Sequence, residues 1–227
     1  MIDYNSNEIF VYFDLETIPS QSPAYLERCL GKVKPPASIK KPESIEKWYS
    51  ESAEAAAQDM FDKSSFDGGR GHICTIAWAK NDGEIKCFHA ATLEDEKPLL
   101  AAFFNDLDPY HSETLVGHNI VGFDIGFLRK RAIALGVKMP GRQSLPRDPK
   151  PWDKNLKDTM IMWAGGGKTV ALDELCDIMG IKGKDGFDGS MVADAWRNGE
   201  HGKIAEYCQD DVMRVREIHK RFMAVDW

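Results

Sequence analysis

The sequence predicts an α/β protein in which a mixed β-sheet is flanked by helices. Residues 8–15 (EIFVYFDL) are rich in β-branched and aromatic side chains, which favour a buried strand. Two further strand-like runs, 72–80 and 84–90, are joined by an Asn-Asp-Gly sequence typical of a hairpin turn. A short strand at 114–117 then alternates with segments of helical spacing. Antiparallel strands followed by alternating strands and helices indicate a mixed sheet.

The same patterns place the other elements and reveal one region of irregular pattern. Residues 20–71 contain Pro, Ser and Lys stretches and one helical patch around 45–60. We interpret this region as an insertion in a single domain spanning 1–227. Residues 138–151 contain four prolines and predict a loop. Helices are expected over residues 93–107, 123–135, 170–179, 190–197 and 204–222.

The composition predicts an intracellular protein without a membrane span. No run approaches the ~18 apolar residues that a span requires, and residues 1–8 lack the layout of a signal peptide. The five cysteines are scattered, and no pair has Cys-x-x-Cys spacing. We therefore expect reduced thiols, a cytoplasmic location and no membrane partner.

The charge of the chain is unevenly distributed. The net charge of −7 argues against extensive coating by nucleic acid, because phosphate affinity comes mainly from lysine and arginine. Residues 129–157 nevertheless contain nine basic and two acidic residues, so this stretch carries +7. It is either a solvated loop and helix face or a track for a phosphate backbone.

Two carboxylates accompany the first predicted strand. Asp14 and Glu16 are two residues apart, so the period-two alternation of a strand points both to the same side. Like charges held together raise one another's pKa, and a divalent cation is the usual remedy. Because an Asp-x-Glu pair at a strand end is also common in turns, this pair alone does not define a site.

Two further motifs carry acids. Asp124 is expected at the start of a helix, where an aspartate often serves only as a cap. Its neighbours Asn119 and Phe123 are not needed for capping. Tyr207 and Asp211 are four residues apart in the last predicted helix and therefore share one face. A buried tyrosine beside a surface acid would produce the same spacing.

The three motifs in this order resemble those of the DEDD exonuclease superfamily, which includes the proofreading domains of DNA polymerases. The resemblance runs from Val11 to Phe222, apart from the insertion, and points to family B proofreading domains and the stand-alone predicted exonucleases related to them. Tyrosine four positions before the last aspartate resembles the tyrosine class, DEDDy. The resemblance implies a ribonuclease H-like (DnaQ-like exonuclease) fold with a mixed five-stranded sheet. It also implies two divalent metal ions, Mg²⁺ or Mn²⁺, held by Asp14, Glu16, Asp124 and Asp211, with Tyr207 placing the attacking water.

The predicted substrate contacts are Leu15, Thr17, Asn119 and Phe123, which precede or flank these acids in the sequence, and Lys184. Residues 183–189 (GKDGFDG) are similar to a Gly-Lys-x-x-aromatic-Asp-Gly turn of family B proofreading domains. This similarity implies that Lys184 approaches the scissile phosphate as a point charge. Asp158 is a candidate outer-shell acid by the same resemblance. The basic stretch 129–157, with Phe123 or Trp152 stacking on bases, is a candidate path for a single strand.

These inferences predict a 3′-5′ exonuclease that hydrolyses single-stranded DNA from its 3′ end and releases nucleoside 5′-monophosphates. An exoribonuclease of the same superfamily is the main alternative, since only contacts to the 2′-hydroxyl distinguish RNA from DNA. A non-catalytic nucleic-acid-binding domain would be expected to have lost at least one acid. A P-loop at 165–169 is excluded because Met162 stands where the motif requires glycine. The chain ends at Trp227, so no attached polymerase domain is expected, and a replication or repair partner is unidentified.

Overall fold

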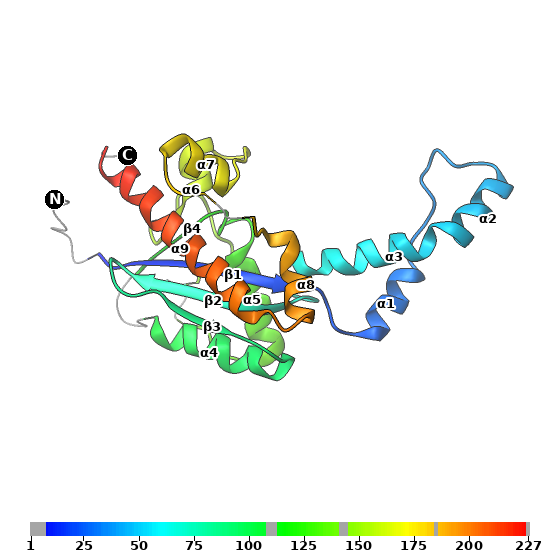
Figure 1. The fold of residues 1–227 in the computed structure, drawn as a ribbon, viewed down its shortest axis with the longest axis horizontal. Coiled ribbons are helices and arrows are strands. Elements are labelled where there is room, and N and C mark those ends of the chain that lie inside the picture. Colours follow the sequence, from blue (N-terminus) through cyan, green and yellow to red (C-terminus); the bar gives the residue numbers. More distant parts are fainter. Residues whose placement is uncertain (1–7, 108–112, 141–144, 184–185, 226–227) are drawn as a thin grey trace.

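The sheet is mixed and five-stranded, with the strand order β3-β2-β1-β4-β5 (Figure 1). The computed structural model describes residues 8–107, 113–140, 145–183 and 186–225. β2 is antiparallel to both β1 and β3, whereas β4 is parallel to both β1 and β5. The strands are β1 (Phe10–Ile18), β2 (His72–Lys80), β3 (Lys86–His89), β4 (Thr114–Gly117) and β5 (Leu156–Asp158).

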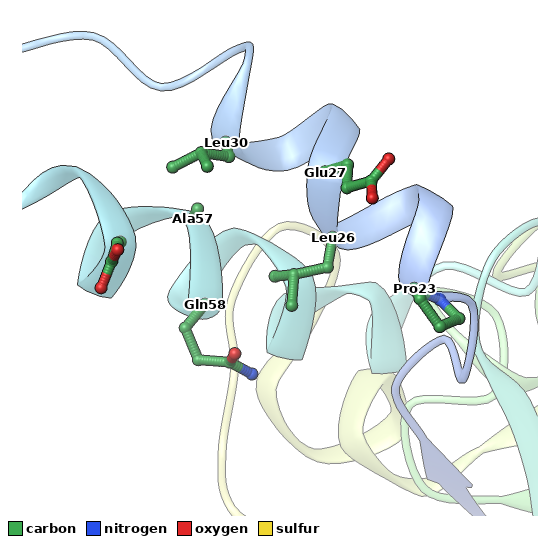
Figure 2. A pocket seen from close by; sticks show the side chains of 7 residues that line it. Pro23, Leu26, Glu27, Leu30, Ala57 and Gln58 are labelled. Atoms are coloured by element: carbon green, nitrogen blue, oxygen red, sulfur yellow. The ribbon is translucent and has the colours of Figure 1, made fainter.

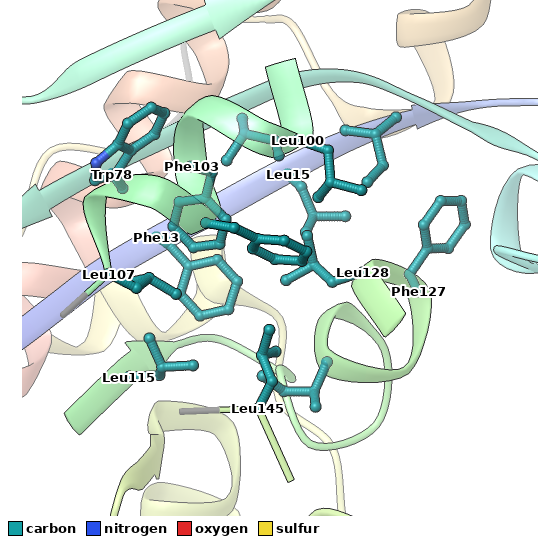
Figure 3. Close-up of a cluster of buried hydrophobic side chains, with 14 of the residues drawn as sticks. Phe13, Leu15, Trp78, Leu100, Phe103, Leu107, Leu115, Phe127, Leu128 and Leu145 are labelled. Atoms are coloured by element: carbon teal, nitrogen blue, oxygen red, sulfur yellow. The ribbon is translucent and has the colours of Figure 1, made fainter. Parts of the chain in front are cut away.

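β1 occupies the centre of the sheet because its side chains pack into two hydrophobic cores, one on each face of the sheet. Val11 and Phe13 are fully buried in one core, where the Phe13 ring stacks on Phe103 with centroids 5.5 Å apart (Figure 3). Phe10 and Tyr12 are buried in the core on the opposite face. A strand whose side chains are apolar on both faces of the sheet is most stable when helices cover both faces.

Helices cover both faces of this sheet. α4 (Glu96–Asp106) and α5 (Asp124–Leu135) contribute to the core that contains Phe13. α7 (Leu172–Met179) and the long α9 (His201–Met223) contribute to the core that contains Tyr12. The shorter helical elements are α6 (Thr159–Ala164), α8 (Val192–Arg197) and the 3₁₀ turns η2 (Leu93–Asp95) and η3 (Gly189–Met191).

An arm of three helices extends from the end of β1, away from the sheet (Figure 1). It has a small apolar core that includes Cys29, Val33, Ala53 and Ala57. A groove of about 450 Å³ lies between α1 and α3 and is lined in part by Leu26 (Figure 2). The arm comprises α1 (Pro23–Leu30), α2 (Pro42–Glu51) and α3 (Ala53–Asp62), and η1 (Lys63–Phe66) joins it to the sheet.

The structure differs from the sequence expectation in several elements. β1 ends at Ile18 rather than at residue 15, so Glu16 lies inside the strand and a β-bulge follows it. The region 20–71 forms three α-helices instead of one helical patch, with Ser52 separating the last two. The sequence pattern does not reveal β5 and α6, because three and six residues are too few to display a period.

All five cysteines are free thiols, and four of them are buried. Burial raises the pKa of the half-buried Cys87 to about 11, so this thiol stays protonated at neutral pH. Among the residues that the structure describes, no helix is long and apolar enough to cross a membrane.

His219 is a fully buried titratable group in the core beneath α9. Its Nδ1 lies 3.1 Å from the Tyr12 hydroxyl, and the Phe10 ring packs against it with centroids 4.9 Å apart. Burial, with a smaller effect from the positive charge of Lys157, lowers the pKa of His219 to about 4. The folded protein therefore requires this imidazole to be neutral.

We expect His219 to make the fold sensitive to acid. Because its pKa is lower in the folded than in the unfolded chain, the stability it provides is present above its ordinary pKa of about 6.5 and is lost as the pH falls toward 4. Between about pH 7.5 and pH 5, the free energy of unfolding should fall by about 2 kcal/mol more in the wild type than in His219→Leu. Urea unfolding at both pH values measures this difference. The exposed control His89→Leu should behave like the wild type, and equal pH dependence in all three proteins would contradict the assignment.

Candidate active site

Asp14 and Glu16 lie on the face of β1 that is covered by α9. The alternation of the strand buries Leu15 in the opposite core, so the two carboxylates project together toward α9. Glu16 is only 9% exposed, and Asp14 is half-buried. One oxygen from each carboxylate and the Cys208 sulfur lie within 4.8 Å of one another.

α9 carries a tyrosine and a further acid to this face. Tyr207 and Asp211 are 9% and 5% exposed, and the Tyr207 hydroxyl donates a hydrogen bond to the Asp211 carboxylate. Cys208 is fully buried, and its thiol contacts the Asp14 carbonyl oxygen at 3.4 Å and Oδ2 at 3.5 Å. Cys208 and Tyr207 therefore lie beside the carboxylates of β1, and Asp211, one helical turn after Tyr207, lies beside Tyr207.

Asp124 is the first residue of α5 and is 4% exposed. The turn before it is tight, because a side chain at Gly117 would collide with the Ile120 side chain. The turn is also held by Asp158 at the end of β5, whose two oxygens accept the backbone N–H groups of Asn119 at 2.9 Å and Val121 at 3.0 Å. Asp158 thus fixes the approach of the chain to Asp124.

The electrostatics of these groups show strong crowding of negative charge. Burial, together with the charges of Asp14 and Asp158, raises the pKa of Asp124 well above its usual range. Burial and the charges of Asp211, Glu16 and Asp14 likewise raise the pKa of Tyr207, so its hydroxyl stays protonated. The pKa of the Cys208 thiol is raised by burial and by Asp14 and Glu16. Tyr207 and Cys208 therefore keep their protons and lie beside the acidic side chains of β1.

Arg214 is a site residue that the motif analysis does not identify. This side chain is 4% exposed, and its Nη1 lies 2.6 Å from Asp211 Oδ1. Its Nε donates to the Lys182 carbonyl at 3.2 Å, and its Nη2 donates to the Gly183 carbonyl at 2.9 Å. The guanidinium therefore ties Asp211 to the segment that precedes residue 184. A charged residue three positions after Asp211 is the only sequence signal for this role.

The predicted substrate contacts are placed differently from one another. The Leu15 side chain is buried in the core, so only its main chain is left to contact a substrate. Thr17 donates from Oγ1 to the Ser65 carbonyl at 2.8 Å. Asn119 is half-buried and has a left-handed backbone, with φ of +64°. Lys184 lies outside the described residues, although Phe187, in the same stretch, packs on Tyr207 with ring centroids 5.2 Å apart.

Two aromatic rings lie beside the acids. Phe123 is half-buried and directly precedes Asp124. Its ring lies 6.3 Å from that of Phe66, which is 71% exposed and belongs to the root of the arm. Phe66 falls in the irregular region of the sequence, where nothing relates it to Asp124. The structure thus adds an exposed ring next to the predicted contact Phe123.

The structure divides the basic stretch 129–157. Arg131 is buried and pairs with Glu96 through two short contacts of 2.7 and 2.6 Å, so it is a structural residue and not part of a phosphate track. Lys130 and Lys150 each pair with a surface aspartate at 2.6 and 2.7 Å. Arg142 lies outside the described residues. Trp152 is 77% exposed, as a stacking residue requires.

The donor set fits a hard divalent cation. Carboxylate oxygens are the preferred ligands of Mg²⁺ and Mn²⁺, and the buried acids repel one another in the absence of a cation. Cys208 does not fit as a ligand for such ions, since its thiol is protonated and contacts Asp14. Asp158 is engaged by backbone N–H groups of the turn and of α6.

Comparison with known proteins identifies relatives of this chain. Residues 71–226 match a family described as predicted 3′-5′ exonucleases related to the exonuclease domain of PolB. DNA polymerase 1 of Pyrococcus abyssi is 21% identical over 182 residues, covering 70% of this chain and 23% of the polymerase. A DNA polymerase of Desulfurococcus sp. (strain Tok) is 23% identical over 178 residues, with the same coverages. The chain therefore spans about a quarter of the length of these relatives.

A solved structure has the same fold. The family B DNA polymerase from Pyrobaculum calidifontis matches 96% of this chain with a TM-score of 0.59 and 19% sequence identity, over 25% of the polymerase chain. This match confirms the expected ribonuclease H-like fold with its mixed five-stranded sheet. Since the family match covers more than half of its residues, the chain belongs to the PolB-related 3′-5′ exonuclease family.

We expect the crowding around Asp124 to destabilise the metal-free protein at high pH. Its pKa is higher in the folded than in the unfolded chain, so stability falls as the pH rises through the folded-state value. Asparagine cannot ionise. In EDTA, Asp124→Asn should therefore raise the thermal unfolding midpoint at about pH 8 more than at about pH 5. The exposed control Asp177→Asn should cause no such pH-dependent difference. A change in midpoint for Asp124→Asn that is equal at both pH values would refute this explanation.

Proposed function

We propose that this family member is a metal-dependent 3′-5′ exonuclease whose active site is the acid cluster described above. The convergence of acids from three separate elements, β1, α5 and α9, carries the proposal. Three of the four acids are less than a tenth exposed, and several acidic side chains buried together with a strongly shifted pKa are typical of functional sites. The cluster comprises Asp14, Glu16, Asp124 and Asp211, with Tyr207 beside it.

The four carboxylates would hold two divalent cations, Mg²⁺ or Mn²⁺. Ionised, the four carboxylates carry a charge of about −4, of which Arg214 offsets one at Asp211 and bound cations would offset the rest. The charge of Asp14 raises the pKa of Asp124 on α5 and of Tyr207 and Cys208 on α9, so Asp14 lies near both helices. When bound, the cations lower the pKa of a coordinated water and relieve the charge on the phosphorus and the leaving oxygen.

Side chains of α9 then orient the attacking water. Tyr207 keeps its proton, so it acts as a hydrogen-bond donor that places the attacking water and not as a base. Asp211 accepts from Tyr207 and is held by Arg214 at 2.6 Å, which fixes the direction of both groups. Water adds to the terminal phosphorus, the bond to the 3′-oxygen of the preceding nucleotide breaks, and a nucleoside 5′-monophosphate leaves.

Single-stranded DNA is the proposed substrate. A free 3′ end reaches acids that are 4% to 9% exposed more readily than a paired end, which must first fray. The adjacent rings of Phe123 and Phe66 offer a surface for stacking, which all bases accept. The named relatives are DNA polymerases, which favours DNA over RNA as the substrate.

We expect single substitutions to separate metal binding from water placement. Asp14→Ala removes a central ligand and should lower kcat by about a thousandfold or more. Tyr207→Phe removes one hydrogen bond and should lower kcat by about ten- to a hundredfold, because the cations still activate water. Steady-state hydrolysis of a labelled oligonucleotide measures both. Asp177→Asn, on the surface of α7, is the control and should keep wild-type activity. A larger loss for Tyr207→Phe than for Asp14→Ala would overturn these roles.

The activity itself is tested with 5′-labelled single-stranded DNA and RNA of one sequence, in Mg²⁺, Mn²⁺ or EDTA. We expect a ladder of 3′-shortened DNA products that requires the metal and disappears in Asp14→Ala. A faster ladder on RNA would identify an exoribonuclease. Absence of cleavage on both strands, with binding retained, would identify a non-catalytic binding domain.

A further inference from the structure

A concentrated positive charge lies on the arm, outside the site. Residues 28–41 contain five basic residues and no acidic residue, whereas the whole chain carries −7. All five side chains are exposed, and none of them forms an ion pair within the described part of the chain. The five are Arg28, Lys32, Lys34, Lys40 and Lys41. Such an unneutralised cluster on an otherwise acidic chain selects for a polyanionic partner.

The segment that directly follows the arm and η1 is anchored on α5. Gly68 packs against α5 so closely that a side chain there would lie 2.8 Å from the Phe127 carbonyl oxygen. Asp67 pairs with Lys130 of α5 at 2.6 Å, and Arg131 donates to the Gly68 carbonyl at 3.4 Å. Helices α1 and α3 pack on one another through the core of the arm. The arm therefore projects from a segment that is anchored on α5, the helix that begins with Asp124.

The root of the arm borders the path to the acids. Phe66 lies against Phe123, and the Ser65 carbonyl accepts from Thr17, one residue after Glu16. α3 has ten residues, so it is about 15 Å long. A nucleic acid with its 3′ end at the acids would meet the root of the arm first and the basic segment further upstream.

We propose that the basic segment 28–41 of the arm binds the phosphate backbone of the nucleic acid upstream of its 3′ end. This inference rests on the proposed function and adds to it a second contact, separate from the acids. Lysine and arginine neutralise phosphates without reading sequence, so the arm selects for length of the strand and not for its bases. The family match begins at residue 71, so the segment is outside the part of the chain that defines the family.

The test compares Lys32→Glu/Lys34→Glu with the control Lys97→Glu/Lys168→Glu. Both variants change the net charge equally, and all four lysines are exposed. Cleavage is measured on single-stranded DNA of four and of 25 nucleotides at several salt concentrations. We expect the arm variant to lower kcat/KM for the long strand about tenfold, to change the short strand less than about twofold, and to reduce the salt slope by about 1.4. The control should change neither strand.

Binding of the long strand is measured separately in EDTA by fluorescence anisotropy. Weaker binding by the arm variant than by the control supports the proposed arm contact, even when no strand is cleaved. Absence of cleavage would then reject only the proposed exonuclease activity. Equal binding by the wild type and both variants, or no binding by any of them, would overturn the arm proposal. If the arm variant binds polyglutamate more weakly than the wild type does but binds DNA equally well, the arm proposal is overturned in favour of an acidic protein partner.

Discussion

Repulsion among buried carboxylates is the constraint on which the rest of this structure depends. Asp14 and Glu16 lie next to one another on β1, and the pKa of Asp124 is raised by burial and by Asp14. The low dielectric constant of an apolar environment strengthens the repulsion between carboxylates and, equally, their attraction for a cation. The fold must therefore hold acids together that would separate in water. β1 achieves this because it lies in the centre of the sheet and because the side chains that alternate with the acids are apolar and buried.

The groups that restrain the acids are neutral donors and one arginine. Asp158 accepts backbone N–H groups from the turn before Asp124, and its place at the end of β5 fixes this turn to the sheet. Arg214 neutralises Asp211 and at the same time binds the carbonyls of Lys182 and Gly183. A single buried guanidinium thus joins the last acid to the segment expected to approach the phosphate. Breaking such a buried pair is costly, since the remaining charge has no partner.

The sequence is informative where one pattern persists over many residues or where acids are arranged in a motif. The β1 acids, Asp124 and the Tyr207–Asp211 pair could be selected because their order resembles the DEDD motifs, and the hairpin and α9 from their long periodic segments. Other features depend on contacts between distant residues. Arg131 looks like part of a basic surface until its pairing with Glu96 is seen, and Phe66 meets Phe123 only because the arm returns to α5. The exposure of the basic residues within 28–41, and that none forms an ion pair within the described residues, is likewise visible only in the fold.

The central claim is that divalent cations relieve the repulsion among the acids of β1, α5 and α9, and that the arrangement exists to bind them. Calorimetric titration of the metal-free protein with Mn²⁺ tests this claim most directly, because it requires neither a substrate nor turnover. We expect saturable binding of about two ions per chain, with loss of at least one of them in Asp14→Asn. Absence of saturable binding, or binding that is the same in Asp14→Asn and the wild type, would contradict it.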